Sequence, residues 1–471
     1  MATKISAVLL TIGAFLAGTA LVAKPVTEGA DGSLTYYKDV LPIVQKNCQG
    51  CHRPGQIGPF SLMSYKETRP WAKAIKNAVA ARKMPPWFAN PQYGHFDNER
   101  SLTQAEIDKI TAWVDAGAIE GDAKDAPAPA QWPEGGWMIK PDVVVELPPY
   151  QVPAKGIKEW EHFAVPSPFK EDTWVTSVEI LPSAPAVAHH LCFDIARHDP
   201  KTPYNLYEWM EVPRDEDGVM KARDGNTQPR EGIVVTRAVG STEEKRRPGR
   251  AVIGGGNQFC YLPGLPFEDY RPANAGVFVP KGSDILLNLH YTANGVATTD
   301  NLRIGFTVAK TPPQKKYVPQ FGAEDDAAPT ERQQANAQLA IPPGADNYPG
   351  PPATISFLRD TELVWFRPHA HVRGKSVQYK LIYPDGKEQI VLDVPHYDFN
   401  WQLTYRTSVK IPKGSKMIVQ FRYDNSPNNK YNPDPTKWVY YGGQSWEEMG
   451  TPNMGFIMDR EANEKDFVKE Q

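Results

Sequence analysis

Two cysteines and a histidine stand together in the run Cys48-Gln49-Gly50-Cys51-His52. This is the pattern that attaches a c-type haem, because both thiols add to the haem vinyl groups and the adjacent histidine becomes an iron ligand. A zinc half-site would need a second ligand pair nearby, and a redox dithiol would need a βαβ context; the sequence shows neither. We therefore expect Cys48, Cys51 and His52 to hold a covalent haem c, and the front of the chain to carry electrons.

The segment before this motif indicates export. Residues 1–23 have a lysine at position 4 followed by an apolar run, and Ala20 and Ala23 are small residues suited to cleavage, as in a secretory signal. The alternative is an uncleaved membrane anchor, because the run approaches the length of a spanning helix. Covalent haem attachment in bacteria also takes place outside the cytoplasm. We expect a periplasmic or secreted protein.

The overall composition does not favour a nucleic-acid-binding protein. The chain has 52 Lys and Arg residues against 55 Asp and Glu residues, a formal charge of −3, and no basic stripe. Its 471 residues suggest about three domains. The 45 prolines and 36 glycines favour many short strands over long helices.

Residues 33–123 have the pattern of a small helical domain. The run Asp39 to Val44 leads into the haem motif, and Pro70 to Arg82 favours a helix with its proline in the first turn. Thr103 and Glu106 have the spacing of a capping box at the start of another helix. This is the three-helix plan of a small cytochrome c, so we expect an all-α cytochrome c domain here.

Met84 is the best candidate for the sixth ligand of the haem iron. Pro85 and Pro86 follow it and fix an extended loop that can present the sulfur. A thioether ligand raises the reduction potential and keeps the iron closed to small ligands. Met63 and His95 are the competitors, and a methionine that only packs in a core is the plain alternative.

A change of composition separates this domain from the rest of the chain. Residues 124–139 are rich in proline and alanine, as in a linker. Beyond them, short runs of β-branched and aromatic residues are separated by Pro, Gly and Asp without intervening helices. This texture predicts antiparallel β-sandwich domains.

Histidines are grouped in this β-rich part. The grouped residues are His189, His190, His290, His369 and His371. His369 and His371 are two residues apart, so in a strand they share a face and can bind one metal ion. The adjacent pair at 189 and 190 would need a bend, for which Pro182 and Pro185 make an irregular entry. Spacing alone does not pair the groups.

A lone histidine is more often a surface or hydrogen-bonded core residue than a metal ligand. We assign that structural interpretation to the four ungrouped histidines of the domains, His95, His162, His198 and His396.

Five motifs follow one another between roughly residues 140 and 460: Ala188–Leu191, Leu289–Tyr291, Arg367–Lys375, Tyr397–Gln402 and Gly442–Met449. In these motifs and their order the chain resembles the copper type II ascorbate-dependent monooxygenases, the family of peptidylglycine α-hydroxylating monooxygenase and dopamine β-monooxygenase. The resemblance implies two consecutive jelly-roll sandwiches, residues 140–315 and 316–462. Each would carry one copper ion, and the two coppers would face each other across an open, solvated cleft.

The same resemblance implies the copper ligands. The first copper would be held by His189, His190 and His290, and the second, catalytic copper by His369, His371 and Met449. Imidazole suits copper in either oxidation state, and a thioether favours Cu(I), the state that meets O2. Met454 and Met458 are nearby, but only Met449 follows the Gly-Gly and acidic pattern of the family.

The implied reaction is the hydroxylation of a C–H bond with O2 on a small organic or peptide-like substrate. Ascorbate is the usual reductant of the family. The haem would instead pass single electrons from a periplasmic donor, so we expect the haem domain to feed the coppers, with an ascorbate-like reductant as the alternative.

Two departures from the family limit the resemblance. Peptide-hydroxylating members hold a C-terminal carboxylate with an arginine, which Arg367 matches, and with a tyrosine shortly after the methionine ligand, which Gly450 to Asn453 does not provide. Peptide amidation is therefore not implied, and Arg367 is either a substrate contact or a structural charge. After haem attachment only Cys192 and Cys260 remain, as a disulfide or as two buried thiols.

Three functions from different classes follow from these observations. The leading one is a haem-linked dicopper monooxygenase. The second is a copper-binding electron-transfer protein that keeps the ligands without the oxygen chemistry, and the third is a non-catalytic structural or copper-storage sandwich.

Overall fold

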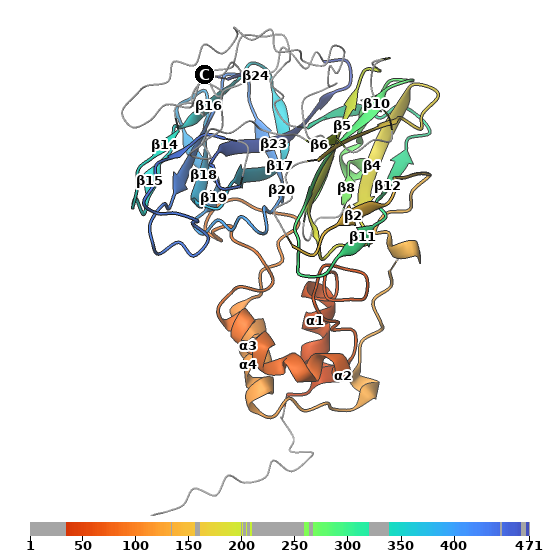
Figure 1. Ribbon diagram of the computed structural model, residues 1–471, viewed down its shortest axis with the longest axis vertical. Helices are drawn as coiled ribbons and strands as arrows, with labels where there is room; N and C mark the ends of the chain where they lie inside the picture. Colours follow the sequence, from red (N-terminus) through yellow and green to blue (C-terminus); the bar gives the residue numbers. More distant parts are fainter. Residues whose placement is uncertain are drawn as a thin grey trace, which may run out of the picture.

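The computed structural model describes residues 34–132, 134–155, 161–198, 200, 204, 208–209, 259–262, 267–319, 339–442, 445–462 and 468–470. The expected signal segment, residues 1–23, lies outside the described residues. Within the described part the chain is mainly β-structure, and its few helices lie near the front of the chain (Figure 1). None of these helices is long and apolar enough to cross a membrane.

The helical region comprises η1 (Tyr36–Val40), α1 (Leu41–Asn47), α2 (Tyr65–Thr68), η2 (Arg69–Trp71), α3 (Ala72–Ala80) and α4 (Gln104–Asp115). The predicted capping box is confirmed at the start of α4: Glu106 N donates to Thr103 Oγ1 at 3.2 Å, and Thr103 N donates to Glu106 Oε2 at 2.8 Å. Tyr36, Ile110 and Trp113 are fully buried between these helices.

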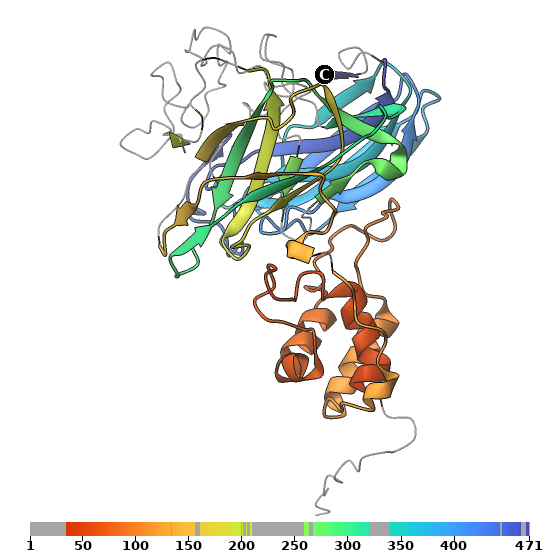
Figure 2. The same ribbon diagram turned by 90° about the vertical axis from the view of Figure 1, so that its right-hand side faces the viewer.

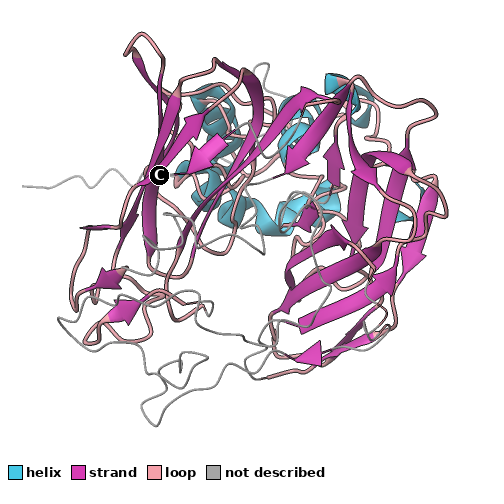
Figure 3. Cartoon of the chain, turned by 90° about the horizontal axis from the view of Figure 1, so that it is seen from above, coloured by secondary structure: helices cyan, strands magenta, loops and turns pink. Residues whose placement is uncertain are grey.

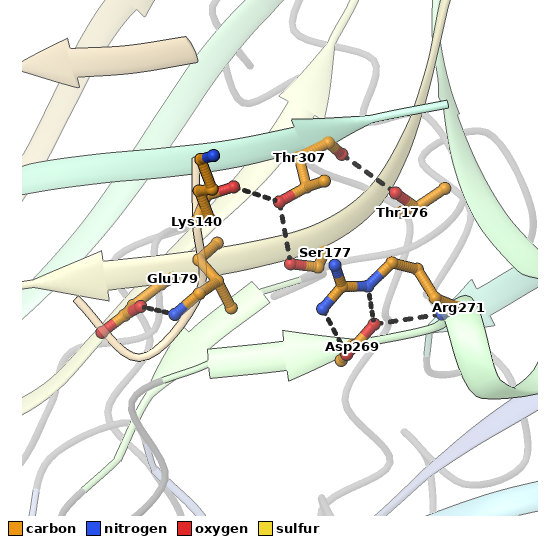
Figure 4. A network of polar contacts seen from close by, with 8 residues as sticks. Lys140, Thr176, Ser177, Glu179, Asp269, Arg271 and Thr307 are labelled. Carbon is orange, nitrogen blue, oxygen red and sulfur yellow. Dashed lines mark hydrogen bonds and ion pairs between the residues drawn. The ribbon is translucent and has the colours of Figure 1, made fainter. Parts of the chain in front are cut away.

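The segment predicted as a linker lies along the helical region and reaches the first β-strands. It contains two short turns, η3 (Ala123–Asp125) and η4 (Glu134–Gly136). Gln45 Nε2 of α1 donates to Ala128 O at 3.2 Å, and the far end is held where Met138 N and Ile139 N donate to Glu179 Oε2 at 2.7 and 2.9 Å. Figure 4 shows this anchor beside a polar cluster in which Thr307 Oγ1 donates to Lys140 O.

The first β-region comprises β1 (Val143–Glu146), β2 (Tyr150–Val152), β3 (Glu161–Pro166), β4 (Thr173–Leu181), β5 (Ala188–Ala196), β6 (Glu208–Trp209), β7 (Phe259–Tyr261), β8 (Phe267–Asp269), β9 (Ala275–Val279), β10 (Asp284–Tyr291), β11 (Thr298–Asp300) and β12 (Arg303–Val308), with the turn η5 (Arg271–Ala273). A five-stranded sheet, in the order β6-β3-β10-β5-β7, encloses a core with strands β1, β12, β4 and β9. Because successive side chains of a strand point to opposite faces, Leu191, Phe193 and Ile195 of β5 all point into this core. The two layers are compatible with a β-sandwich.

The second β-region comprises β14 (Ala340–Ile341), β15 (Tyr348–Pro349), β16 (Ala353–Phe357), β17 (Thr361–Ala370), β18 (Gly374–Ile382), β19 (Glu388–Val394), β20 (Tyr405–Ile411), β21 (Lys416–Tyr423), β22 (Val439–Tyr440), β23 (Gly450–Asp459) and β24 (Val468–Glu470). Its six-stranded sheet contains β19, β18, β21, β16 and β24, with β15 beside β21. The facing strands β23, β17 and β20 contribute Phe366, Met454 and Phe456 to the enclosed core.

One strand joins the two β-regions into a continuous sheet. Strand β13 (Lys315–Pro319) pairs in parallel with β9, Lys315 opposite Ala275, and antiparallel with β23, Lys315 opposite Asp459. The nine-stranded sheet therefore runs from β1 through β9, β13 and β23 to β20. The domain boundary predicted between residues 315 and 316 falls inside the strand that connects the two regions, which Figure 3 shows side by side.

The helical region is docked on the β-regions rather than attached only through its chain connection (Figure 2). Trp87, Ala89 and Phe96, from the segment between α3 and α4, belong to the core of the second β-region. Polar contacts follow the same segment: Asn90 Nδ2 donates to Asp393 Oδ2 at 2.9 Å, and Asn98 Nδ2 donates to Thr404 O at 2.8 Å.

The stability that Glu179 contributes where it anchors the linker depends on pH. Burial raises the pKa of this carboxyl to about 7, against the lowering effect of its backbone hydrogen bonds. Because the folded-state pKa lies above the ordinary value of 4.5, the carboxyl stabilises the folded protein to its full extent below pH 4.5. This stabilisation is lost as the pH rises through about 7. We expect the free energy of unfolding to fall over this range by up to about 3 kcal/mol from this group.

Glu179→Gln should remove this part of the pH profile, measured by urea denaturation at pH 5 and pH 8. Glu146→Gln, which changes an exposed carboxylate on β1, is the control and should keep the full slope. An unchanged slope in Glu179→Gln would show that the carboxyl is ionised throughout.

Candidate functional site

Three histidines converge where β5 starts and β10 ends. His290 pairs with His190, whereas the next residue, Tyr291, pairs with Ala188, so His189 forms a β-bulge. This bulge is the bend that an adjacent histidine pair requires. His190 and His290 project from the face of the sheet opposite the core, because their neighbours Leu191 and Leu289 point into it.

The ring nitrogens of these three histidines face one another. His189 Nδ1 lies 3.3 Å from His290 Nδ1 and 2.9 Å from His190 Nδ1. One nitrogen from each ring can be chosen so that all three lie within 4.8 Å of one another. Within the described residues this is the one group of three or more His, Cys, Asp or Glu side chains close enough to share a metal ion.

Burial keeps two imidazoles of this first group, His189 and His190, neutral. Burial, followed by the neighbouring His290 and His369, lowers the pKa of His189 to about 3. Burial also lowers the pKa of His190 well below its ordinary value. Neutral imidazoles keep their lone pairs available, which is the protonation state that zinc or copper requires.

The second group stands at the end of β17. Alternation along this strand buries Phe366 and Ala370 in the second core and turns Trp365, Arg367 and His369 toward the first β-region. His371 follows directly after the strand, with its ring centroid 5.2 Å from that of His369. Two imidazoles thus share one side of the strand, as the two-residue spacing predicts.

Each ring of the second group is held by an oxygen acceptor at Nδ1. His369 Nδ1 lies 2.7 Å from Gln402 Oε1, and His371 Nδ1 lies 3.3 Å from Glu447 O. With the proton on Nδ1, both Nε2 lone pairs remain for a metal ion. This is the arrangement by which neighbouring groups orient metal-binding histidines.

Glu448 ties Met449 to the histidine strand. Its carboxylate accepts hydrogen bonds from His371 N at 2.5 Å, Arg373 N at 2.9 Å and Met449 N at 2.9 Å. Burial nevertheless raises the pKa of this carboxyl to about 7. Because β23 begins with Gly450 opposite Ala370, Met449 stands at the next position, beside His371.

The other two methionines of this region belong to the packing. Met454 and Met458 lie in β23 and are buried within the second core, Met454 completely. Their positions agree with the choice of Met449 as the candidate ligand. That role remains a prediction.

The two histidine groups lie closer together than they would across the open, solvated cleft that the resemblance implies. The ring centroids of His190 and His369 are 6.4 Å apart, and His190 and His371 are buried. The shared sheet through β13 holds the regions in this position. The five histidines form one nearly continuous cluster in this structure.

Arg367 is engaged in an ion pair between the two β-regions. Its Nη2 lies 2.6 Å from Glu268 Oε1 on β8, and its Nε donates to Thr404 Oγ1 at 2.9 Å. Both charged side chains are buried. Among the described residues, the pocket that Arg367 lines includes none of the grouped histidines. The arrangement favours a structural role for Arg367 over contact with a substrate, the other alternative that the sequence left open.

The haem motif follows the end of α1. Cys51 N and His52 N both donate to Cys48 O, at 3.1 and 2.9 Å, which folds the motif into a turn. His52 Nδ1 lies 3.1 Å from Phe60 O, an arrangement that leaves Nε2 for an iron ion. Burial raises the pKa of Cys48 to about 12 and also raises that of Cys51, which disfavours a reactive dithiolate.

The candidates for the sixth iron ligand differ in their surroundings. Met84 is partly buried and follows the end of α3. Met63 is also partly buried, whereas His95 is exposed and its backbone oxygen accepts from Thr407 Oγ1 at 2.8 Å on the second β-region. His95 thus belongs to the docked segment, and Met84 stays the preferred prediction.

The structure resolves the alternative left open for the remaining cysteines. Cys192 of β5 and Cys260 of β7 are cross-strand partners and form a disulfide. This bridge fastens the edge strand β7 next to the strand that carries His189 and His190.

Sequence reasoning missed three residues around the second group: Phe399, Gln402 and Glu448. All three lie within the quoted motifs Tyr397–Gln402 and Gly442–Met449, but neither motif indicates what its side chains contact. The sequence pattern included these residues but gave them no role, because their histidine partners lie 28 or more positions away along the chain.

The chain matches no protein-family model and no curated protein. Among solved structures, the stem and receptor-binding domain of the spike protein P1 from bacteriophage PM2 aligns over 71% of this chain and 98% of its own, at 8% identity and a TM-score of 0.13. A TM-score this low carries no argument about fold or function.

Breaking the Glu268–Arg367 pair should destabilise the contact between the β-regions. Glu268→Gln leaves the Arg367 charge buried without its carboxylate, which we expect to lower the free energy of unfolding by about 3–5 kcal/mol. Asp269→Asn, at the next position, removes the partly exposed pair with Arg271 and should cost less than about 1 kcal/mol. Chemical denaturation of both variants measures the difference, and equal losses would contradict the assigned role of the buried pair.

Proposed function

We propose that this protein is an exported, haem-linked dicopper monooxygenase related to the copper type II ascorbate-dependent monooxygenases. The observation that carries the proposal is the pairing of two imidazole groups, one of three histidines and one of two, across neighbouring β-layers. The proposed fold is a cytochrome c domain followed by two jelly-roll sandwiches. The proposed location, the periplasm or the cell exterior, rests on residues 1–23 and on the haem motif.

The donor sets suit two copper ions. The first site would be held by the imidazoles of His189, His190 and His290, of which burial keeps His189 and His190 neutral. The second would be held by the Nε2 atoms of His369 and His371, with the Met449 sulfur as a softer third donor. Gln402 and the backbone oxygen of Glu447 orient the two rings of the second site.

Hydroxylation of a C–H bond with O2 consumes two electrons and two protons, and it gives an alcohol and water. When bound, the coppers would supply the single-electron steps and the activation of O2. The chain's own residues hold the ligands in place and exclude water: His190 and His371 are buried, and Glu448 fixes the backbone of both His371 and Met449.

Cys48, Cys51 and His52 would hold a haem that supplies electrons to the copper sites. The docking of the helical region through Trp87, Phe96 and the asparagines of the same segment supports delivery within one molecule. An external periplasmic donor would then reduce the haem, in place of the direct ascorbate reduction usual in the family.

A second candidate function is copper and haem electron transfer without oxygen chemistry. The closeness of the two histidine groups favours it, because rings 6.4 Å apart leave little room for a substrate between them. Oxygen consumption coupled to formation of an alcohol separates the two candidates.

The first test is the copper content of the purified full chain, measured by elemental analysis and electron paramagnetic resonance. We expect two type 2 Cu(II) ions in the wild type and one in His371→Ala, because the second site loses one of its two imidazoles. His396→Ala, which removes an exposed histidine outside both groups, is the control and should keep two. Two coppers in His371→Ala would contradict the assignment of the second site.

The second test concerns electron delivery. Rapid mixing of ferrous haem protein with and without Cu(II) should show reoxidation of the haem only in the copper-loaded protein, at a first-order rate constant that does not depend on protein concentration. A haem that stays reduced in the copper-loaded protein would remove the haem from the proposed electron path.

A further inference from the structure

The loop Tyr397–Gln402, between β19 and β20, is fastened to the second histidine group at both ends. Tyr397 donates its hydroxyl to Ala370 O at 2.9 Å and accepts from Ala370 N at 3.1 Å, so it brackets the residue between His369 and His371. At the other end, Gln402 Oε1 contacts His369 Nδ1 at 2.7 Å. The position of the loop is therefore set by the histidine strand itself.

The middle of the loop has its own internal support. Asp398 Oδ1 accepts from Asn400 N at 2.9 Å, and Asp398 O accepts from Trp401 N at 3.1 Å. These bonds form a tight turn in which Phe399 is the residue next to Asp398. The direction of the Phe399 side chain thus follows from a turn that is held on both sides.

Phe399 reaches both histidine groups. Its ring centroid lies 5.0 Å from the ring of His189, in the first group, and 6.2 Å from the ring of His371, in the second. The ring is partly exposed, whereas His371 is buried. A partly exposed aromatic ring therefore stands against both groups at a position that solvent reaches.

We propose that Phe399 is the aromatic wall that limits the size of the ligands and substrates admitted to the two histidine groups. The inference rests on the proposed function, because it takes both groups as metal sites. The ring is apolar, so the substrate portion that lies against it is a small hydrocarbon group whose C–H bond is presented to the second site. A larger group would have to displace the ring from its contacts with His189 and His371.

The test uses azide and 4-phenylimidazole as small and bulky probes of the Cu(II)-loaded full chain. Their binding is followed at the copper by electron paramagnetic resonance, which separates copper signals from those of the haem. Phe399→Ala should bind 4-phenylimidazole about tenfold more tightly than the wild type, which is the scale of the ring contacts removed. Azide binding should change much less, because azide is small enough to pass the ring.

Two variants keep this test decisive. Phe399→Leu retains an apolar side chain in the turn and should give intermediate binding of 4-phenylimidazole. Phe278→Ala removes an exposed ring that packs on Trp174 of β4, away from both histidine groups, and should behave as the wild type.

The outcomes separate this inference from the proposed function. Two bound coppers with unchanged 4-phenylimidazole binding in Phe399→Ala would overturn the role of Phe399 while leaving the metal sites in place. A loss of copper in Phe399→Ala would also overturn it, because the ring would then support the ligands and would not limit access. Failure of the wild type to bind two coppers would count against the proposed function itself.

Discussion

The shared nine-stranded sheet is the constraint on which the rest of this structure depends. Strand β13 hydrogen-bonds to β9 on one side and to β23 on the other, so the two β-regions have a fixed relation at the level of the backbone. Two sandwiches joined only by a loop could separate, whereas a common sheet must break ladder hydrogen bonds to do so. The short separation between His190 and His369 follows from this connection.

Buried polar groups then define the site within that frame. The Glu268–Arg367 ion pair links the two β-regions. The Glu448 carboxylate accepts hydrogen bonds from three backbone N–H groups around the second histidine group. Buried polar atoms are costly without partners, so such networks admit few alternative arrangements. The histidine rings consequently stand in orientations that their own short side chains could not fix alone.

The helical region also packs against the second β-region, which belongs to the shared sheet. Trp87 packs edge-on against Tyr405 of β20, with ring centroids 4.9 Å apart, and Asp97 N donates to the backbone oxygen of Arg406 on that strand. Strand β20 in turn pairs with β17, which leads to His369 and His371. The segment between α3 and α4 and the strand that leads to the second histidine group therefore pack in one core.

Local structural features of the chain were predicted from the sequence alone. The capping box at Thr103 and the common face of His369 and His371 depend on neighbours within a few residues, so spacing was sufficient to predict them. The bend at His189 was also anticipated, because adjacent side chains in a regular strand point to opposite faces.

Only the tertiary structure decided how these pieces meet. The disulfide between Cys192 and Cys260, the engagement of Arg367 by Glu268, the placement of Phe399 against both histidine groups and the closeness of those groups all join residues at least 28 positions apart. Such contacts are set by strand pairing and by the burial of polar groups, and neither leaves a periodic signal in the sequence. Sequence determined which histidines were candidates for a shared cluster, whereas the shared sheet determined that the two histidine groups stand together.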